Sequence, residues 1–204
     1  MNQENQQLET QDSVDNLNKV KKTEPNSFSE ILHFALIALL IVLPVRWFIA
    51  QPFIVSGSSM EETFHNNDYL IVDQLSYRLD DPKRGDVVIF RYPIDTSKFF
   101  IKRIIGLPGE TVSVDGQTVT IINNEHPEGF VLSEDYANIG TKDNDTKITL
   151  KENEYFVLGD NRDHSSDSRV WGILPSEDII GRALLRLYPP TQASLMPGDT
   201  DFNQ

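Results

Sequence analysis

An uncharged and mostly apolar run, residues 31–45, constrains the fold of this chain more than any other feature, and the apolar character resumes after Arg46. About 20 mostly apolar helical residues span a bilayer core. Residues 28–50 therefore predict one transmembrane helix, with Glu30 at one boundary and Arg46 at the other. The preceding stretch is long and acidic, and no small-residue cleavage site follows, so we interpret the segment as an uncleaved anchor. A buried core helix is the alternative.

The basic residues around this segment predict its orientation. Lys19, Lys21 and Lys22 precede the segment, whereas Arg46 is the only basic residue close behind it. The positive-inside rule then places the N-terminus in the cytoplasm and the rest of the chain on the extracytoplasmic face of the cell membrane. Residues 1–27 are polar and lack aromatic side chains, so we expect a disordered cytoplasmic tail.

Short runs typical of β-strands follow the apolar segment, separated by turn residues. The predicted strands are 69–72, 86–90, 99–105, 111–114, 118–122, 154–158 and 179–188. The pattern predicts a mainly β chain, with an antiparallel β-barrel or sandwich-like domain over residues 51–190 beside the one N-terminal transmembrane helix. Within the domain, the polar residues 123–147 are expected to form an insertion or cap, and residues 191–204 a flexible C-terminal tail.

Composition excludes several functions. The net charge of −13 argues against a nucleic-acid partner, because phosphate binding favours a basic surface. The chain has no cysteine, and therefore neither disulfides nor thiolate chemistry. Its four histidines, residues 33, 65, 126 and 164, lack the spacing of a metal site. We therefore predict neither a metal nor a cofactor.

A serine and a lysine form the strongest chemical signal. Ser59 lies in the polar run 56–60, and a serine hydroxyl is a weak nucleophile until a neighbouring base takes its proton. Lys102 lies in the apolar run 99–106, where burial would lower the pKa of its amine and allow it to act as that base. Gly57 relaxes the backbone near Ser59, whose main-chain N–H could stabilise a developing oxyanion. The pair predicts a Ser/Lys hydrolase at a membrane surface.

The alternative interpretations are an ordinary turn serine and an edge-strand lysine that blocks aggregation. A polar run, residues 158–169, adds a third element. Within it, Ser165 could hydrogen-bond the lysine amine, and Asp167 and Arg169 could pair to fix the loop. The run also contains His164, which leaves a Ser/His/Asp triad open as a rival mechanism. Its acidic member would be Asp160, Asp163 or Asp167.

Four segments of the chain are distinctive: SGSSM (56–60), RGDVVIF (84–90), KRIIGLPGE (102–110) and GDNRDHSSDSRVWG (159–172). Taken together, in their order and spacing, they resemble the type I signal peptidases, the leader peptidases of bacterial export. The resemblance implies that Ser59 is the nucleophile and Lys102 the general base. It also implies that Ser165 orients the lysine and that Asp167 and Arg169 form a structural ion pair.

The resemblance implies a membrane-anchored serine endopeptidase that removes signal peptides from exported proteins after a small-x-small motif. Its expected partners are signal-peptide-bearing preproteins and the lipid bilayer, and the chain is expected to be a monomer. Glu62 departs from the family pattern, which has proline there, and Gly57 replaces a serine that assists the oxyanion hole in some members. Alternatives are a self-cleaving Ser/Lys regulator and a catalytically impaired, membrane-tethered β module that binds exported peptides.

Overall fold

The computed structural model describes residues 27–140, 145–200 and 202. These residues separate into two compact units, which divide between Leu43 and Pro44. The predicted disordered tail, apart from Ser27, and the lysines that predict the membrane orientation lie outside the described residues.

Helix α2 (Ser27–Pro44) contains most of the N-terminal apolar segment, and its large apolar side chains are exposed. A π-helical turn, Val45–Ile49, follows it, and strand β1 begins at Ala50. None of the helices among the described residues is both long and apolar enough to cross a membrane. The expected transmembrane helix over 28–50 is therefore not found. The α-helix has 18 residues, which rise about 27 Å against a hydrocarbon core of about 30 Å.

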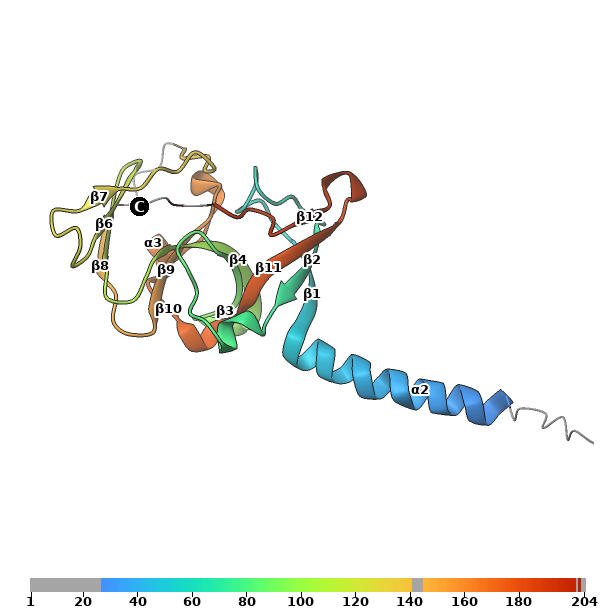
Figure 1. The fold of residues 1–204 in the computed structure, drawn as a ribbon. Coiled ribbons are helices and arrows are strands. Elements are labelled where there is room, and N and C mark those ends of the chain that lie inside the picture. The colour runs from blue at the N-terminus through green and yellow to red at the C-terminus, as the bar shows by residue number, and fades with distance from the viewer. Residues whose placement is uncertain (1–26, 141–144, 201, 203–204) are drawn as a thin grey trace, which may run out of the picture. The chain divides into compact units, whose positions relative to one another are not determined.

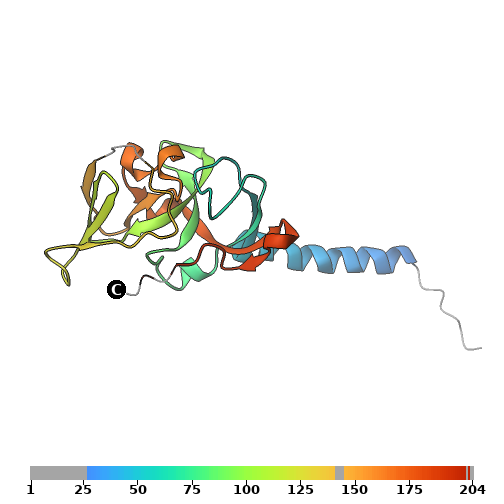
Figure 2. The same cartoon turned by 90° about the horizontal axis from the view of Figure 1, so that it is seen from above.

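The remaining chain is mainly β, as predicted, and forms two antiparallel sheets (Figures 1 and 2). The larger sheet has the order β1-β2-β11-β3-β4-β9-β10, with β12 paired to β11. Its strands are β1 (Ala50–Ile54), β2 (Tyr69–Asp73), β3 (Val87–Tyr92), β4 (Asp95–Gly106), β9 (Glu154–Leu158), β10 (Leu174–Pro175), β11 (Ile179–Tyr188) and β12 (Ser194–Leu195).

The smaller sheet has the order β7-β6-β5-β8. It consists of β5 (Thr111–Asp115), β6 (Thr118–Ile122), β7 (Phe130–Val131) and β8 (Thr146–Thr149). Neither sheet closes on itself among the described residues, so the predicted barrel is corrected to two open sheets. A barrel needs its end strands to pair, whereas β1 and β10 lie at opposite ends of the larger sheet.

Apolar side chains from alternate strand positions form the cores. One cluster lies on β5 and β6 and includes Ile105 and Phe156, and a second joins β2 to the segment around Met60 and Phe64. A third lies between β3, β4 and β9 around Phe90. The middle of β4 thus contacts cores on both of its faces, which makes this strand a rigid support for its side chains.

The segments predicted to be irregular contain some regular structure. Strand β7 and the start of β8 lie within the predicted 123–147 insertion. The predicted flexible tail, 191–204, contains β12, which pairs with β11. The ring of Phe202 packs against the core beside the smaller sheet. The tail was predicted to be flexible because its local sequence is polar. The structure differs from this prediction because the tail contacts residues that are distant in the sequence, and these contacts hold it in place.

Candidate active site

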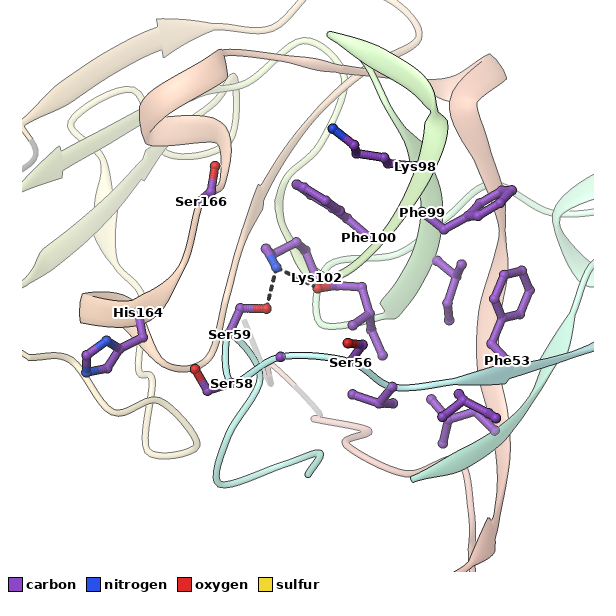
Figure 3. A pocket seen from close by; sticks show the side chains of 16 residues that line it. Phe53, Ser56, Ser58, Ser59, Lys98, Phe99, Phe100, Lys102, His164 and Ser166 are labelled. Carbon is purple, nitrogen blue, oxygen red and sulfur yellow. Dashed lines mark hydrogen bonds between the residues drawn. The ribbon is translucent and has the colours of Figure 1, made fainter. Parts of the chain in front are cut away.

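Ser59 and Lys102 meet between the end of β1 and the middle of β4 (Figure 3). The Lys102 Nζ donates a hydrogen bond to the Ser59 Oγ at 2.6 Å and a second to the Ile101 carbonyl at 2.9 Å. A neutral amine at the same distance can instead accept the Ser59 hydroxyl proton. The two residues that sequence analysis selected as nucleophile and base are therefore within proton-transfer distance.

Burial controls the charge of Lys102. Its side chain lies among the apolar residues of β4, and the residue is only 3% exposed. Desolvation lowers the pKa of this lysine from 10.5 to about 8, although the carboxylates of Asp167 and Asp160 oppose the shift. The Phe100 ring lies 5.4 Å from Nζ and helps to exclude water. An appreciable fraction of the amine is thus neutral near neutral pH.

Several contacts fix the turn that carries Ser59. Met60 and Phe64 on its C-terminal side are buried, and Phe64 N donates to the Met60 carbonyl at 2.8 Å. Asn161 N donates to the Ser59 carbonyl at 3.1 Å, and the Asn161 side chain donates to the Ser58 carbonyl at 3.1 Å. The loop after β9 therefore holds Ser59 by its backbone and leaves its hydroxyl to contact the lysine.

Gly57 has a φ of +103°, a conformation that side chains disfavour. A Cβ at this position would contact nothing within 4 Å, so the glycine is required by its backbone angle rather than by crowding. The space beside it opens into a cavity of about 610 Å³. Residues 53–59 line one side of this cavity, and 98–102 of β4 line another. It is large enough to hold several residues of an extended peptide.

The remaining candidate residues, Ser165, Asp167 and Arg169, lie in the loop after β9, and not all of them make the contacts that were expected. Asp167 and Arg169 form the predicted ion pair, with Arg169 Nε 2.8 Å from Asp167 Oδ1, and the Asp167 carboxylate also accepts from Gly159 N at 3.1 Å. Ser165 Oγ is buried and makes no hydrogen bond to any described residue, so the expected bond to Lys102 is not made. A Cβ at Gly159 would lie 2.2 Å from Ser165 Oγ and 2.5 Å from the Ser59 carbonyl.

The geometry does not assemble a Ser/His/Asp triad. His164 is exposed at the cavity edge, and its ring points away from Ser59 (Figure 3). The Ser59 hydroxyl is engaged by Lys102 instead. Within the described ranges, no group of histidine and carboxylate side chains is arranged to hold a metal ion.

A buried charge network that the sequence did not predict lies next to Ser59 and Lys102. Arg103 bonds Asp160 at 2.9 and 2.6 Å, and Asp160 accepts from Thr63 Oγ1 at 2.5 Å. The network therefore connects the residue after Lys102 to the turn of Ser59. The only sign of this network in the local sequence is that Arg103 lies on the face of β4 opposite Lys102.

Glu62, the departure from the family pattern, adopts a φ of +87°. Proline is fixed near −65°, so a proline could not occupy this backbone conformation. The turn after Ser59 thus differs locally from one that contains proline, while the contact between Ser59 and Lys102 is retained.

Comparisons with known proteins agree with the motifs and the geometry. Residues 28–188 match the family described as signal peptidase, peptidase S26. The chain is 36% identical over 199 residues to the probable signal peptidase I-2 of Synechocystis sp., covering 94% of this chain and 88% of that protein. It is 37% identical over 161 residues to signal peptidase I of Leptolyngbya laminosa, covering 75% and 76%. It is also 31% identical over 186 residues to signal peptidase I T of Bacillus subtilis, covering 88% and 95%.

The family match contains both Ser59 and Lys102 and spans more than half of the chain. The resemblance inferred from four short segments is confirmed by relatives that align over most of their own length. The chain therefore belongs to the signal peptidase family, peptidase S26.

Proposed function

We propose that this protein is a serine endopeptidase that cleaves signal peptides from exported proteins, with Ser59 as nucleophile and Lys102 as general base. The observation that carries the proposal is the 2.6 Å contact between Lys102 Nζ and Ser59 Oγ, made by an amine that is almost completely buried. Such an amine can take the serine proton near neutral pH.

The reaction then has two halves. Ser59 Oγ attacks the scissile carbonyl carbon, and its proton passes to Lys102 Nζ. When the tetrahedral intermediate collapses, the C–N bond breaks, Lys102 returns the proton to the leaving amine, and an ester to Ser59 remains. Lys102 next deprotonates a water molecule, which hydrolyses the ester and restores the serine.

Four supporting residues have proposed roles. The backbone angle at Gly57 leaves the Ser59 N–H available to the developing oxyanion. The ion pair of Asp167 and Arg169 holds the loop after β9 in place, because the Asp167 carboxylate also binds Gly159 N. Ser165 borders the same site through its close approach to Gly159, and its unpaired hydroxyl is available to the lysine amine after a small movement.

We also propose that residues 28–50 attach the protein to a membrane. The large apolar side chains of α2 are exposed along its length, which is unfavourable in water. Attachment would concentrate the enzyme where signal peptides emerge. The extracytoplasmic location of the catalytic domain and the monomeric state remain predictions.

The substrate class can be tested with the purified full chain in detergent. We expect cleavage of a preprotein on the C-terminal side of an Ala-x-Ala motif, located by mass determination of both products. A preprotein with tryptophan in place of the two alanines should resist cleavage, because shallow pockets accept only small side chains. Binding of the preprotein without any cleavage would instead support the catalytically impaired β module.

The lowered pKa of Lys102 predicts the pH dependence of this activity. The neutral amine is the active form, so kcat/KM should rise with pH up to about 8 and then level off. Below that pH the rate should fall about tenfold per pH unit, because the amine is increasingly protonated. A profile that keeps rising toward the pKa of a free lysine would contradict a buried base.

A further inference from the structure

A second cleft, which shares only Phe99 with the lining of the catalytic cavity, is basic. It has a volume of about 540 Å³, and its charged lining side chains are Arg46, Arg78 and Arg91. The other lining residues carry no charge: Gln51, Gln74, Tyr77, Phe99, Ile179 and Ile180. Three positive charges without a lining carboxylate are unexpected in a protein whose net charge is −13.

These three arginines differ from every other arginine in the chain. The other six each form an ion pair with a carboxylate of a described residue: Arg84, Arg103, Arg162, Arg169, Arg182 and Arg186. The three that line the cleft form no such pair within the described part of the chain.

The nearby carboxylates of the described residues form no ion pair with the three arginines of the cleft. Asp178 is influenced by the charge of Arg91, but the two form no ion pair. Asp73 is bound by Ser76 and Arg182, and Asp86 by Tyr77. The positive charge of the cleft is therefore available to an external anion.

Exposed apolar side chains lie close to these arginines in the sequence, and Phe99 lines the cleft itself. Phe48 is 50% exposed and Leu79 is 79% exposed, and Leu75 and Phe99 also face solvent. The Arg78 guanidinium lies 5.1 Å from the centre of the Phe48 ring, so the charged and apolar groups are adjacent. Arg46 follows the apolar residues of α2 directly in the sequence. A ligand that fits both groups has an anionic head and an apolar tail.

We propose that this arginine cleft binds the phosphate of an anionic phospholipid headgroup. Guanidinium groups bind phosphate through paired N–H donors, and arginine suits planar, bidentate recognition of this kind. The exposed Phe48 and Leu79 would contact the acyl chains. A free phosphate shares the head chemistry but has no apolar part to place against these exposed side chains. None of the three arginines contacts Ser59 or Lys102, so the inference does not depend on the peptidase mechanism.

Binding can be measured with the full chain in a non-ionic detergent. The probe is a short-chain phosphatidylglycerol, compared with a phosphatidylcholine of the same chain length and with inorganic phosphate. The test variant is Arg78→Gln/Arg91→Gln. The control variant, Lys147→Gln/Lys151→Gln, removes two charges from exposed lysines on and beside β8. Peptide cleavage by each variant, expected at the wild-type rate, verifies that the fold is intact.

We expect the wild type and the control to bind phosphatidylglycerol more tightly than phosphatidylcholine, and added salt to weaken this binding. In the test variant the affinity for phosphatidylglycerol should fall by about tenfold or more. Equal affinities of the test and control variants for phosphatidylglycerol would contradict binding at the arginine cleft. Equal affinities for phosphatidylglycerol and phosphatidylcholine would overturn recognition of an anion. Phosphate binding as tight as that of phosphatidylglycerol would overturn the lipid as the ligand.

Discussion

Replacing Lys102 by methionine is expected to lower kcat for preprotein cleavage by about 10³-fold or more. Methionine has a similar length and an apolar body, so it fits the buried position, but it cannot accept the Ser59 proton. Because methionine would fill the same space in the cavity lining, KM should change little. Steady-state kinetics on a preprotein or a short Ala-x-Ala peptide measure both constants.

Two comparisons make this result specific. Ser59→Ala should lose as much activity as Lys102→Met, and the double variant should lose little more, because nucleophile and base act as one unit. Lys98→Met is the matched control: Lys98 lies on the same strand and lines the same cavity, but it is exposed and pairs with Asp95. It should retain near wild-type kcat.

A different outcome would identify another mechanism. Retained activity in Lys102→Met together with a large loss in His164→Ala would contradict the Ser/Lys pair and support the triad. Circular dichroism and the unfolding midpoint of each variant separate lost chemistry from lost structure. The buried position of Lys102 makes this check necessary, although exchange of a buried amine for a thioether removes a desolvation cost.

Seven of the strands were predictable because their signals are local, whereas β1, β7, β8, β10 and β12 were not predicted. Apolar residues in β4, β9 and β11 recur between turn residues, and Asp115-Gly116 correctly marks the hairpin between β5 and β6. Alternation of side chains along a strand also places Lys102 and Arg103 on opposite faces of β4. The sheet order was not predictable, because β11 pairs with both β2 and β3, which lie far earlier in the sequence.

The contact between Ser59 and Lys102 was predictable from chemistry, since a serine nucleophile needs a neighbouring base and a lysine in an apolar strand can be one. The supporting contacts were not, because each depends on long-range packing. Asp160 lies 57 residues after Arg103, and nothing in either local sequence indicates their pairing. The unpaired Ser165 hydroxyl likewise reflects the tight approach of Gly159, which depends on the folded loop.

Replacing Arg103 by methionine is expected to destabilise the protein by about 3–5 kcal/mol, the usual cost of removing one partner of a buried ion pair. The side chains of Arg103 and Asp160 are 0% and 1% exposed, so water cannot solvate the carboxylate that remains. The loss also frees the carbonyl of Gly85 and the hydroxyl of Thr200, which Arg103 binds at 2.9 and 3.1 Å. Urea unfolding, with the slope compared between variants, measures the change.

The matched control is Lys151→Met, which breaks a long ion pair of 3.8 Å on the surface and should change stability by at most about 1 kcal/mol. Asp160→Asn should cost a similar amount to Arg103→Met, because it leaves the buried guanidinium without a counter-charge. The double variant should then lose clearly less than the sum of the single variants, since neither charge remains. Strictly additive losses would contradict a coupled pair.

Because Asp160 also binds Thr63 in the turn of Ser59, the single variants should lower kcat at temperatures where they remain folded. This would link a buried ion pair to the placement of the nucleophile.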